Sequence, residues 1–317
     1  MSRRQPWPYT NRMAAAARCK VFRLLASAAL LAIVTACGGG GQPTRDGTTQ
    51  EPGSISAENP TTQKSAKRGI AYGGHSAADL SALSAGISWW YNWSPEPEAG
   101  AAAAYSGLGV AFVPMVWGGT PDADQVTAAI PEGAQHLLGF NEPNFISQAN
   151  KTPSEAAALW PVLEEVAAKR NLQIGAPALN YCGDCVSEGG KTYSDPIDYL
   201  DAFLAACDGC RIDFIPVHWY ACDVGALQWY VDRFKKYGKP IWVTEFACGD
   251  NPHDQITLAV QKDYMQAAVA YLESEPAVAR YAWFSGRNNE IPFINLLGAD
   301  GELTELGSLY VSLPAAE

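Results

Sequence analysis

The chain has 317 residues, with 33 acidic against 22 basic side chains and a formal net charge of −11 at pH 7. Six of the basic residues lie in the first 37 positions, which hold no Asp or Glu, so the remainder carries 33 acidic and 16 basic side chains and a charge near −17. Nucleic acids and anionic lipid surfaces are bound through clustered Lys and Arg, so this composition argues against both as partners.

The first 37 residues have the features of an export signal. Basic positions lead into an apolar run over 24–36, which is too short for a membrane-spanning helix. The run ends in Ile33-Val-Thr-Ala-Cys37, which resembles a bacterial lipoprotein processing site. We therefore expect residues 1–37 to be a lipoprotein signal peptide with a lipidated Cys37, and the protein to be exported and membrane-anchored, in the periplasm or at the cell surface. A plain secretory peptide is the alternative, and Met13 is a second candidate start.

Residues 38–67 are rich in Gly, Gln, Thr, Ser and Pro. Such a segment has little apolar surface to bury, so it is predicted to be a flexible tether with a reach of roughly 30 Å. The lipid anchor would then be the only contact with the membrane. Residues 68–317 are about as long as one barrel domain.

Strand-like and helical patterns alternate through residues 68–317. Short apolar runs predict strands at 69–72, 87–93, 110–116, 136–140, 172–176, 212–217, 241–244 and 279–284. Between them, helical periodicity predicts helices at 77–83, near 99, and at 122–130, 153–170, 196–206, 226–237, 255–273 and 306–313. Eight alternating units predict a single-domain α/β fold, the (β/α)8 TIM barrel. A doubly wound open sheet is the alternative, but no glycine-rich phosphate loop follows the first strand.

Two glutamates follow predicted strands about a hundred residues apart. Glu142 comes after the run at 136–140, and Glu245 comes directly after the run at 241–244. The carboxyl ends of barrel strands are where active sites form. A carboxylic acid and a carboxylate on opposite sides of a sugar are the groups that cleave a glycosidic bond. The pair therefore predicts a catalytic site for glycoside hydrolysis.

The other residues at the predicted strand ends are mainly aromatic rings and amides. Rings cover the C–H faces of sugars, whereas Asn, His and Tyr hydrogen-bond sugar hydroxyls, so the set indicates carbohydrate as the substrate. A role in core packing is the alternative for each Trp. We predict no metal and no cofactor. The predicted substrate-binding residues are Trp90, Tyr91, Asn92, Trp93, Trp117, Asn141, Asn180, His218, Trp219, Tyr220 and Trp283.

Five strings together resemble glycoside hydrolase family 128, a family of endo-β-1,3-glucanases in the glycosyl hydrolase catalytic core group. They are Trp89-Trp-Tyr-Asn-Trp93, Phe112-Val-Pro-Met-Val-Trp117, Leu138-Gly-Phe-Asn-Glu-Pro143, His218-Trp-Tyr220 and Trp242-Val-Thr-Glu-Phe246. The resemblance implies a retaining barrel glycosidase of clan A, with Glu142 as acid/base and Glu245 as nucleophile. Retention requires the two carboxyl groups to lie about 5 to 5.5 Å apart.

Further expectations follow from the mechanism that this resemblance implies. Asn141 is placed to bond the sugar 2-hydroxyl, and Tyr220 to orient Glu245. Asn144 departs from the Asp expected after Asn-Glu-Pro, which puts in question how this loop is held. Two alternative functions stay open: a barrel glycanase for another neutral β-glycan, such as β-mannan or β-1,6-glucan, and a surface glycan-binding lipoprotein without turnover. We expect a monomer whose partner is a β-glucan polysaccharide or oligosaccharide.

Six cysteines remain in the predicted domain, and four of them form two C-x-x-C pairs, an outline similar to a zinc ribbon. In a barrel, one pair would follow the fifth strand and the other would close the fifth helix, at opposite ends of a helix about 15 Å long. The pairs are therefore too far apart to share a metal. In an oxidising compartment we predict the disulfides Cys182–Cys185, Cys207–Cys210 and Cys222–Cys248.

Overall fold

The computed structural model describes residues 64–315. The predicted signal peptide, Cys37 and the tether up to residue 63 lie outside the described residues. The first described residue, Lys64, contacts the domain, because its Nζ donates to the backbone oxygen of Gly109 at 2.9 Å. Lys67 Nζ donates to the backbone oxygens of Leu272, Glu273 and Glu275, at the carboxyl end of helix α7 (Leu258–Ser274). Residues 64–67 therefore belong to the domain, a few positions ahead of the predicted boundary.

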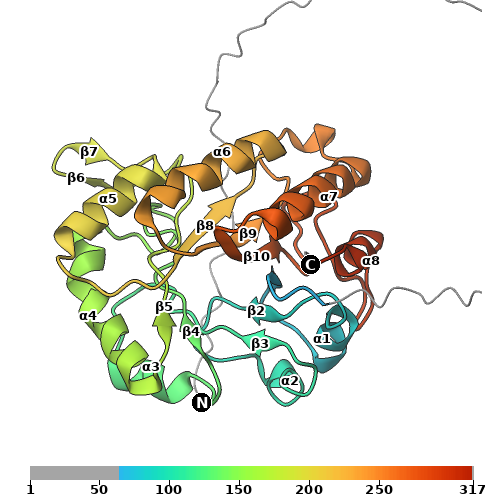
Figure 1. Cartoon of the computed structure of the whole chain (residues 1–317), viewed down its shortest axis with the longest axis horizontal. Coiled ribbons are helices and arrows are strands. Elements are labelled where there is room, and N and C mark those ends of the chain that lie inside the picture. Colours follow the sequence, from blue (N-terminus) through green and yellow to red (C-terminus); the bar gives the residue numbers. More distant parts are fainter. Residues whose placement is uncertain (1–63, 316–317) are drawn as a thin grey trace, which may run out of the picture. The chain divides into compact units, whose positions relative to one another are not determined.

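Eight parallel strand segments surround a central axis, and helices lie around their outside (Figure 1). Their bounds are β1 (Arg68–Ala71), β2 (Trp89–Tyr91), β3 (Ala111–Phe112), β4 (His136–Leu137), β5 (Gln173–Ile174), β8 (Ile215–Trp219), β9 (Ile241–Phe246) and β10 (Val278–Phe284). Each begins within three residues of its predicted start, which confirms the predicted α/β class and the strand count of the barrel.

Strand pairing runs around the whole ring. Six strands form one sheet in the order β3-β2-β1-β10-β9-β8, and β4 pairs with β5. Single parallel bridges complete the ring: Met115 with Leu138 joins β3 to β4, and Gly175 with Phe214 joins β5 to β8. Pro114 lies at the first of these joints and has no N–H to donate to a ladder, so the pairing there is limited to short contacts.

The helices are α1 (Ala77–Leu83), α2 (Ala99–Ala102), α3 (Ala123–Ala129), α4 (Pro153–Arg170), α5 (Pro196–Ala206), α6 (Val224–Phe234), α7 (Leu258–Ser274) and α8 (Glu305–Ser312), with 3-10 turns η1 (Lys235–Tyr237) and η2 (His253–Gln255). Helix α4 begins as its sequence predicts, with Thr152 and Glu155 forming a capping box ahead of Pro153. Pro161 lies inside this helix, and the helix continues past it to Arg170 although a proline removes one backbone hydrogen bond. In the described part of the chain, no helix combines the length and hydropathy that crossing a membrane requires.

Side chains on the strands divide between two apolar clusters. The inner cluster fills the barrel and includes Trp89, Tyr91, Met115, Phe214 and Trp242. The outer cluster lies between strands and helices and holds most of the remaining buried apolar residues. Because successive residues of a strand point to opposite faces, this division decides which strand-end residues reach the barrel mouth.

The sequence patterns missed one element, a short antiparallel hairpin in the loop after β5. It consists of β6 (Ser187–Glu188) and β7 (Lys191–Thr192), joined by two glycines with positive φ, Gly189 and Gly190. Strands of two residues give too little alternation to be recognised in a sequence.

Candidate active site

Glu245 points into the barrel because β9 contains a one-residue bulge. Val217 pairs with Val243, but the next residue of β8, His218, pairs with Glu245, so Thr244 is extra. A bulge changes which face the following residues occupy. Without it, Glu245 would point out toward the helices, since Trp242 lies in the inner cluster and Val243 in the outer one.

Three side chains donate hydrogen bonds to the Glu245 carboxylate. The Tyr91 hydroxyl donates to Oε1 at 2.9 Å, and Trp93 Nε1 donates to the same oxygen at 2.8 Å. The Tyr220 hydroxyl donates to Oε2. The three donors therefore hold the Glu245 side chain through both of its carboxylate oxygens.

Glu142 lies in the turn that follows β4. Its backbone has φ 42°, in the left-handed region that residues other than glycine seldom adopt. Glu142 N donates to Ala178 O at 2.8 Å. The carboxylate Oε1 faces His218 Nδ1 at 2.8 Å and accepts from Asn180 Nδ2 at 3.4 Å.

The structure brings the two glutamates together across one imidazole. His218 Nδ1 lies 2.8 Å from Glu142 Oε1 and 3.4 Å from Glu245 Oε2, and the three residues each place one nitrogen or carboxylate oxygen within 4.8 Å of the other two. Glu142 is 6% exposed and Glu245 is 5% exposed. The limit of 4.8 Å between carboxylate oxygens of the two glutamates is shorter than the roughly 6.5 to 9.5 Å that leaves room for a water in inverting glycosidases.

His218 is fully buried between the two carboxyl groups. Burial alone would lower the pKa of its imidazole, but the charge of Glu245 and the hydrogen bond and charge of Glu142 outweigh it, so the pKa is raised. Burial and the same two carboxylates raise the pKa of the Tyr220 phenol well above its usual value. Tyr220 therefore keeps its proton and remains a donor to Glu245.

Within residues 64–315, one group of side chains has donor atoms close enough to surround a metal ion, and it is this same trio of Glu142, His218 and Glu245. Protein donors already bond one oxygen of Glu142 and both oxygens of Glu245. The hydrogen bonds thus explain the arrangement of the carboxylates without a cation.

Aromatic rings line the mouth of the barrel beside the glutamates. Trp93, Trp117 and Phe284 are half-buried and pack against the inner cluster from its open side. Phe284 contacts both Trp93 and Tyr220, with ring centroids 6.0 and 5.6 Å apart. Trp93 and Trp117 were predicted site residues, whereas Phe284 was missed because Trp283 was chosen in its place.

Three tryptophans predicted to bind substrate point the other way. Trp90, Trp219 and Trp283 all belong to the outer cluster and are at most 6% exposed. Trp90 packs on Phe112, and the other two donate their indole N–H groups to backbone oxygens nearby. Their assignment to the substrate site is wrong, because strand alternation turns each of them toward the helices.

The predicted amide residues have different environments. Asn92 is bonded within its own loop, accepting from Ser94 N and donating to Glu96 O, so it shapes the loop. Asn141 is 1% exposed, and its Oδ1 has no hydrogen-bond partner in the described chain. An unpaired buried acceptor beside Glu142 is compatible with the predicted bond to a sugar hydroxyl.

All three predicted disulfides are present. Cys222–Cys248 joins the loops after β8 and β9, and both Gly249 N and Asp250 N donate to Tyr220 O. This bridge therefore supports the residue that donates to Glu245 Oε2. Cys207–Cys210 closes the end of α5, while Cys182–Cys185 lies in the loop after β5.

A ring of eight parallel strands with two buried glutamates meeting at the strand ends is the architecture of a glycoside hydrolase. The family model described as "Glycosyl hydrolase catalytic core" matches residues 69–310, and the chain belongs to this family. The resemblance to glycoside hydrolase family 128 is confirmed by solved structures of that family.

Two of these structures are endo-β-1,3-glucanases. A GH128 (subgroup II) endo-β-1,3-glucanase from Sorangium cellulosum is 48% identical, with a TM-score of 0.71 over 79% of this chain and 100% of that one. A GH128 (subgroup I) endo-β-1,3-glucanase from Amycolatopsis mediterranei, in complex with laminaritriose, is 32% identical, with a TM-score of 0.63 over 78% of this chain and 99% of that one.

A curated relative is the Alkali-sensitive linkage protein 1 of Schizosaccharomyces pombe, which is 31% identical over 268 residues. The match covers 78% of this chain but 45% of the relative, so the chain spans about half the length of that protein.

Proposed function

We propose that this protein is a retaining endo-β-1,3-glucanase that cleaves β-1,3-glucan by double displacement. The observation that carries the proposal is the pairing of Glu142 and Glu245 across His218, with one carboxylate oxygen of each glutamate and one imidazole nitrogen all within 4.8 Å of one another. The choice of β-1,3-glucan is supported by the 48% identity to the Sorangium enzyme over its whole length.

The different surroundings of the two glutamates support different roles. Glu245, bonded by three donors, is the carboxylate and attacks the anomeric carbon. Glu142 gives its proton to the departing glycosidic oxygen as the bond to that oxygen breaks and a glycosyl ester forms on Glu245. Glu142 then takes a proton from water, whose oxygen attacks the anomeric carbon and releases Glu245 as a carboxylate. In this second step, His218 donates to the ionised Glu142.

Purified residues 64–317 should release oligosaccharides from linear β-1,3-glucan, and the first products should keep the β configuration in proton NMR spectra taken during turnover. β-Mannan and β-1,6-glucan serve as parallel substrates, and Glu245→Gln is the inactive control. Cleavage of mannan or β-1,6-glucan instead would contradict the proposed linkage. First products with the α configuration would contradict the double displacement, and binding without products would favour a glycan-binding protein.

We further propose that the protein is an exported lipoprotein held by lipid on Cys37 through the tether. Support comes from the basic leader, the apolar run and the sequence around Cys37. The described chain enters the barrel at the amino end of β1, whereas Glu142 follows β4 and Glu245 lies near the carboxyl end of β9, so residue 64 and the glutamates belong to opposite ends of the barrel. Fatty-acid labelling of cells should mark the protein, and a Cys37→Ala variant should lose both the label and membrane association. Equal labelling of that variant would refute the anchor.

A further inference from the structure

The turn that carries Glu142 needs external support. Glu142 has φ 42°, and Phe145 N closes the turn by donating to Glu142 O at 2.9 Å. A left-handed backbone at a residue other than glycine costs on the order of 1 kcal/mol or more, and it persists only where surrounding contacts hold it. The turn precedes α4 by several residues, so no helix fixes it.

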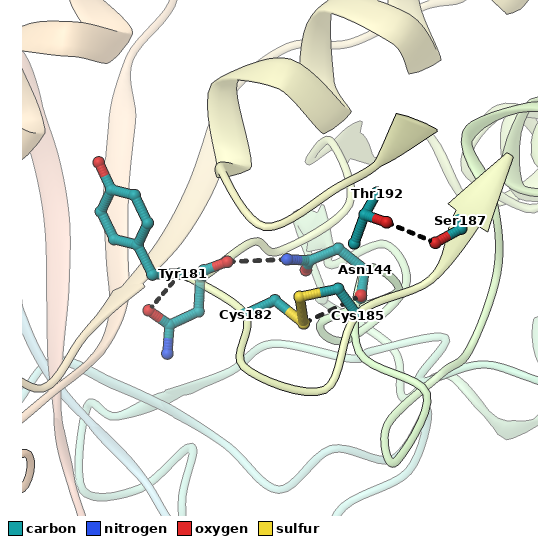
Figure 2. The surroundings of a disulfide bond; sticks show 7 residues. Asn144, Tyr181, Cys182, Cys185, Ser187 and Thr192 are labelled. Carbon is teal, nitrogen blue, oxygen red and sulfur yellow. Dashed lines mark hydrogen bonds between the residues drawn. A yellow bond between two sulfur atoms is a disulfide. The ribbon is translucent and has the colours of Figure 1, made fainter. Parts of the chain in front are cut away.

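The loop after β5 provides that support. Asn144 is fully buried, and its Nδ2 donates to Asn180 O at 2.8 Å (Figure 2). Backbone contacts continue the attachment: Val186 N donates to Asn144 O at 2.9 Å, Ile146 N donates to Asp184 O at 2.8 Å, and Phe145 pairs with Cys185 in an antiparallel bridge. Three consecutive residues of the turn, 144–146, are thus bonded to the loop at 180–186.

Asn180 connects this loop to the Glu142 carboxylate itself. Its Oδ1 accepts from Tyr181 N at 2.8 Å, which orients the amide so that Nδ2 faces Glu142 Oε1 at 3.4 Å. The Asn180 backbone oxygen accepts from Asn144. An Asp at position 144 would place a carboxylate oxygen against this carbonyl oxygen, so the amide at 144 is what allows the connection.

The Cys182–Cys185 disulfide closes the part of the loop that contacts the turn. Figure 2 shows this disulfide beside Asn144, whose backbone oxygen lies 3.3 Å from Cys182 Sγ. Cys185 pairs with Phe145 through the backbone. Gly183 and Asp184, the two residues inside the bridge, are exposed and have no apolar core to fix them. The disulfide is therefore the feature that restricts this stretch to the conformation that bonds the turn.

We propose that the Cys182–Cys185 loop, acting through Asn144 and Asn180, is the device that positions Glu142 for proton transfer. This inference rests on the proposed function. Asn144, Asn180 and the two cysteines are positioning residues, since they act on the glycosidic bond through Glu142. The unit has no bond to Glu245 among the described contacts, so it affects the acid/base and leaves the nucleophile in place.

A comparison of leaving groups tests the proposal. Cleavage of glucan needs a proton from Glu142, whereas a 2,4-dinitrophenyl glycoside of a β-1,3-glucan oligosaccharide releases a phenolate that needs none. In the full domain, Cys182→Ser with Cys185→Ser should lower kcat on glucan about tenfold, the size of loss that a small misplacement of a catalytic group causes. Release of the first dinitrophenolate, measured before steady state, should change by less than about twofold.

The chain contains a matched control. Cys207→Ser with Cys210→Ser removes a bridge of the same sequence separation at the end of α5 and should change neither rate. Asn144→Asp keeps the disulfide and the side-chain size, and it should give the same loss on glucan alone. This second variant decides the matter if the double cysteine variant does not fold, as judged by circular dichroism.

Two results would overturn the inference. Equal loss on both substrates would mean that the loop supports the whole site rather than Glu142, and no loss on glucan in the folded variants would mean that it supports neither. A wild-type domain that cleaves neither substrate would refute the proposed function itself and this inference with it. If the wild-type domain is active, the results for the variants test only the positioning role of the Cys182–Cys185 loop.

Discussion

Asp79, in the first turn of α1, ties the long loop after β10 to the barrel. It is 1% exposed and receives two bonds from Arg287, at 2.7 and 2.8 Å. Burial alone would raise the pKa of its carboxyl group, but hydrogen bonds from Arg287, Gly301 N and Ser76 N outweigh burial and lower the pKa to about 2. Asp79 is thus more stable as a carboxylate in the folded protein than in the unfolded chain.

The lowered pKa sets the expected cost of Asp79→Asn. A fall from 3.8 to about 2 corresponds to roughly 2.5 kcal/mol of folding free energy at about 1.4 kcal/mol per tenfold change in proton affinity. Because the pKa of Asp79 is lower in the folded protein than in the unfolded chain, the stabilisation is present above pH 3.8 and is lost as the pH falls toward 2. At pH 3, about half of it should remain.

Urea denaturation of wild type and Asp79→Asn at pH 7 and pH 3 measures both quantities. The variant should be less stable by about 2.5 kcal/mol at pH 7 and by about half of that at pH 3. Asp201→Asn is the matched control, because Asp201 pairs with Lys236 at the surface, where such a pair contributes about 1 kcal/mol or less. A difference that stays constant between the two pH values, or one no larger than that of the control, would refute the reasoning.

Three further substitutions test the site. Glu245→Gln should lower kcat on β-1,3-glucan by at least about a thousandfold, as expected for loss of a nucleophile; near-normal turnover would remove Glu245 from that role. Tyr220→Phe removes one bond to the carboxylate and should slow hydrolysis of the glycosyl ester about tenfold or more, because a hydrogen bond to a charged group is worth about 1.5 to 3 kcal/mol. Pre-steady-state kinetics should then show a burst, and an unchanged second step would contradict the assignment. Phe284→Ala should raise KM on glucan about tenfold by removing a ring at the barrel mouth; an unchanged KM would show that this ring does not contact substrate.

Local signals in the sequence were sufficient to predict the frame of the fold. Helix α4 is specified by Thr152, Pro153 and Glu155, whose capping chemistry acts within one turn. The strands were located because runs buried on both faces are continuously apolar. The pairing of the two glutamates followed from their positions after the fourth and the seventh strands, since a closed ring brings all strand ends to one face.

The direction of each aromatic side chain was not predictable from the same signals. In a strand buried on both faces, every residue is apolar, so composition does not reveal which residues point inward. Trp89 and Tyr91 lie in the inner cluster while Trp90 lies in the outer one, although all three are aromatic and fully buried. The same ambiguity led to the choice of Trp283 over Phe284.

If one inward-pointing residue of a strand were known, alternation would give the direction of the other side chains. Strand β9 shows why one known residue is not enough. Counting by twos from the inward Trp242 makes Thr244 inward and Glu245 outward. The extra residue at Thr244 shifts the count by one, so Glu245 takes the inward position and Phe246 lies in the outer cluster. The Thr244 side chain is fully buried, and its hydroxyl donates to Val217 O at 3.5 Å. The position of the proposed nucleophile therefore depends on pairing between β8 and β9, a contact between distant segments that no pattern within β9 records.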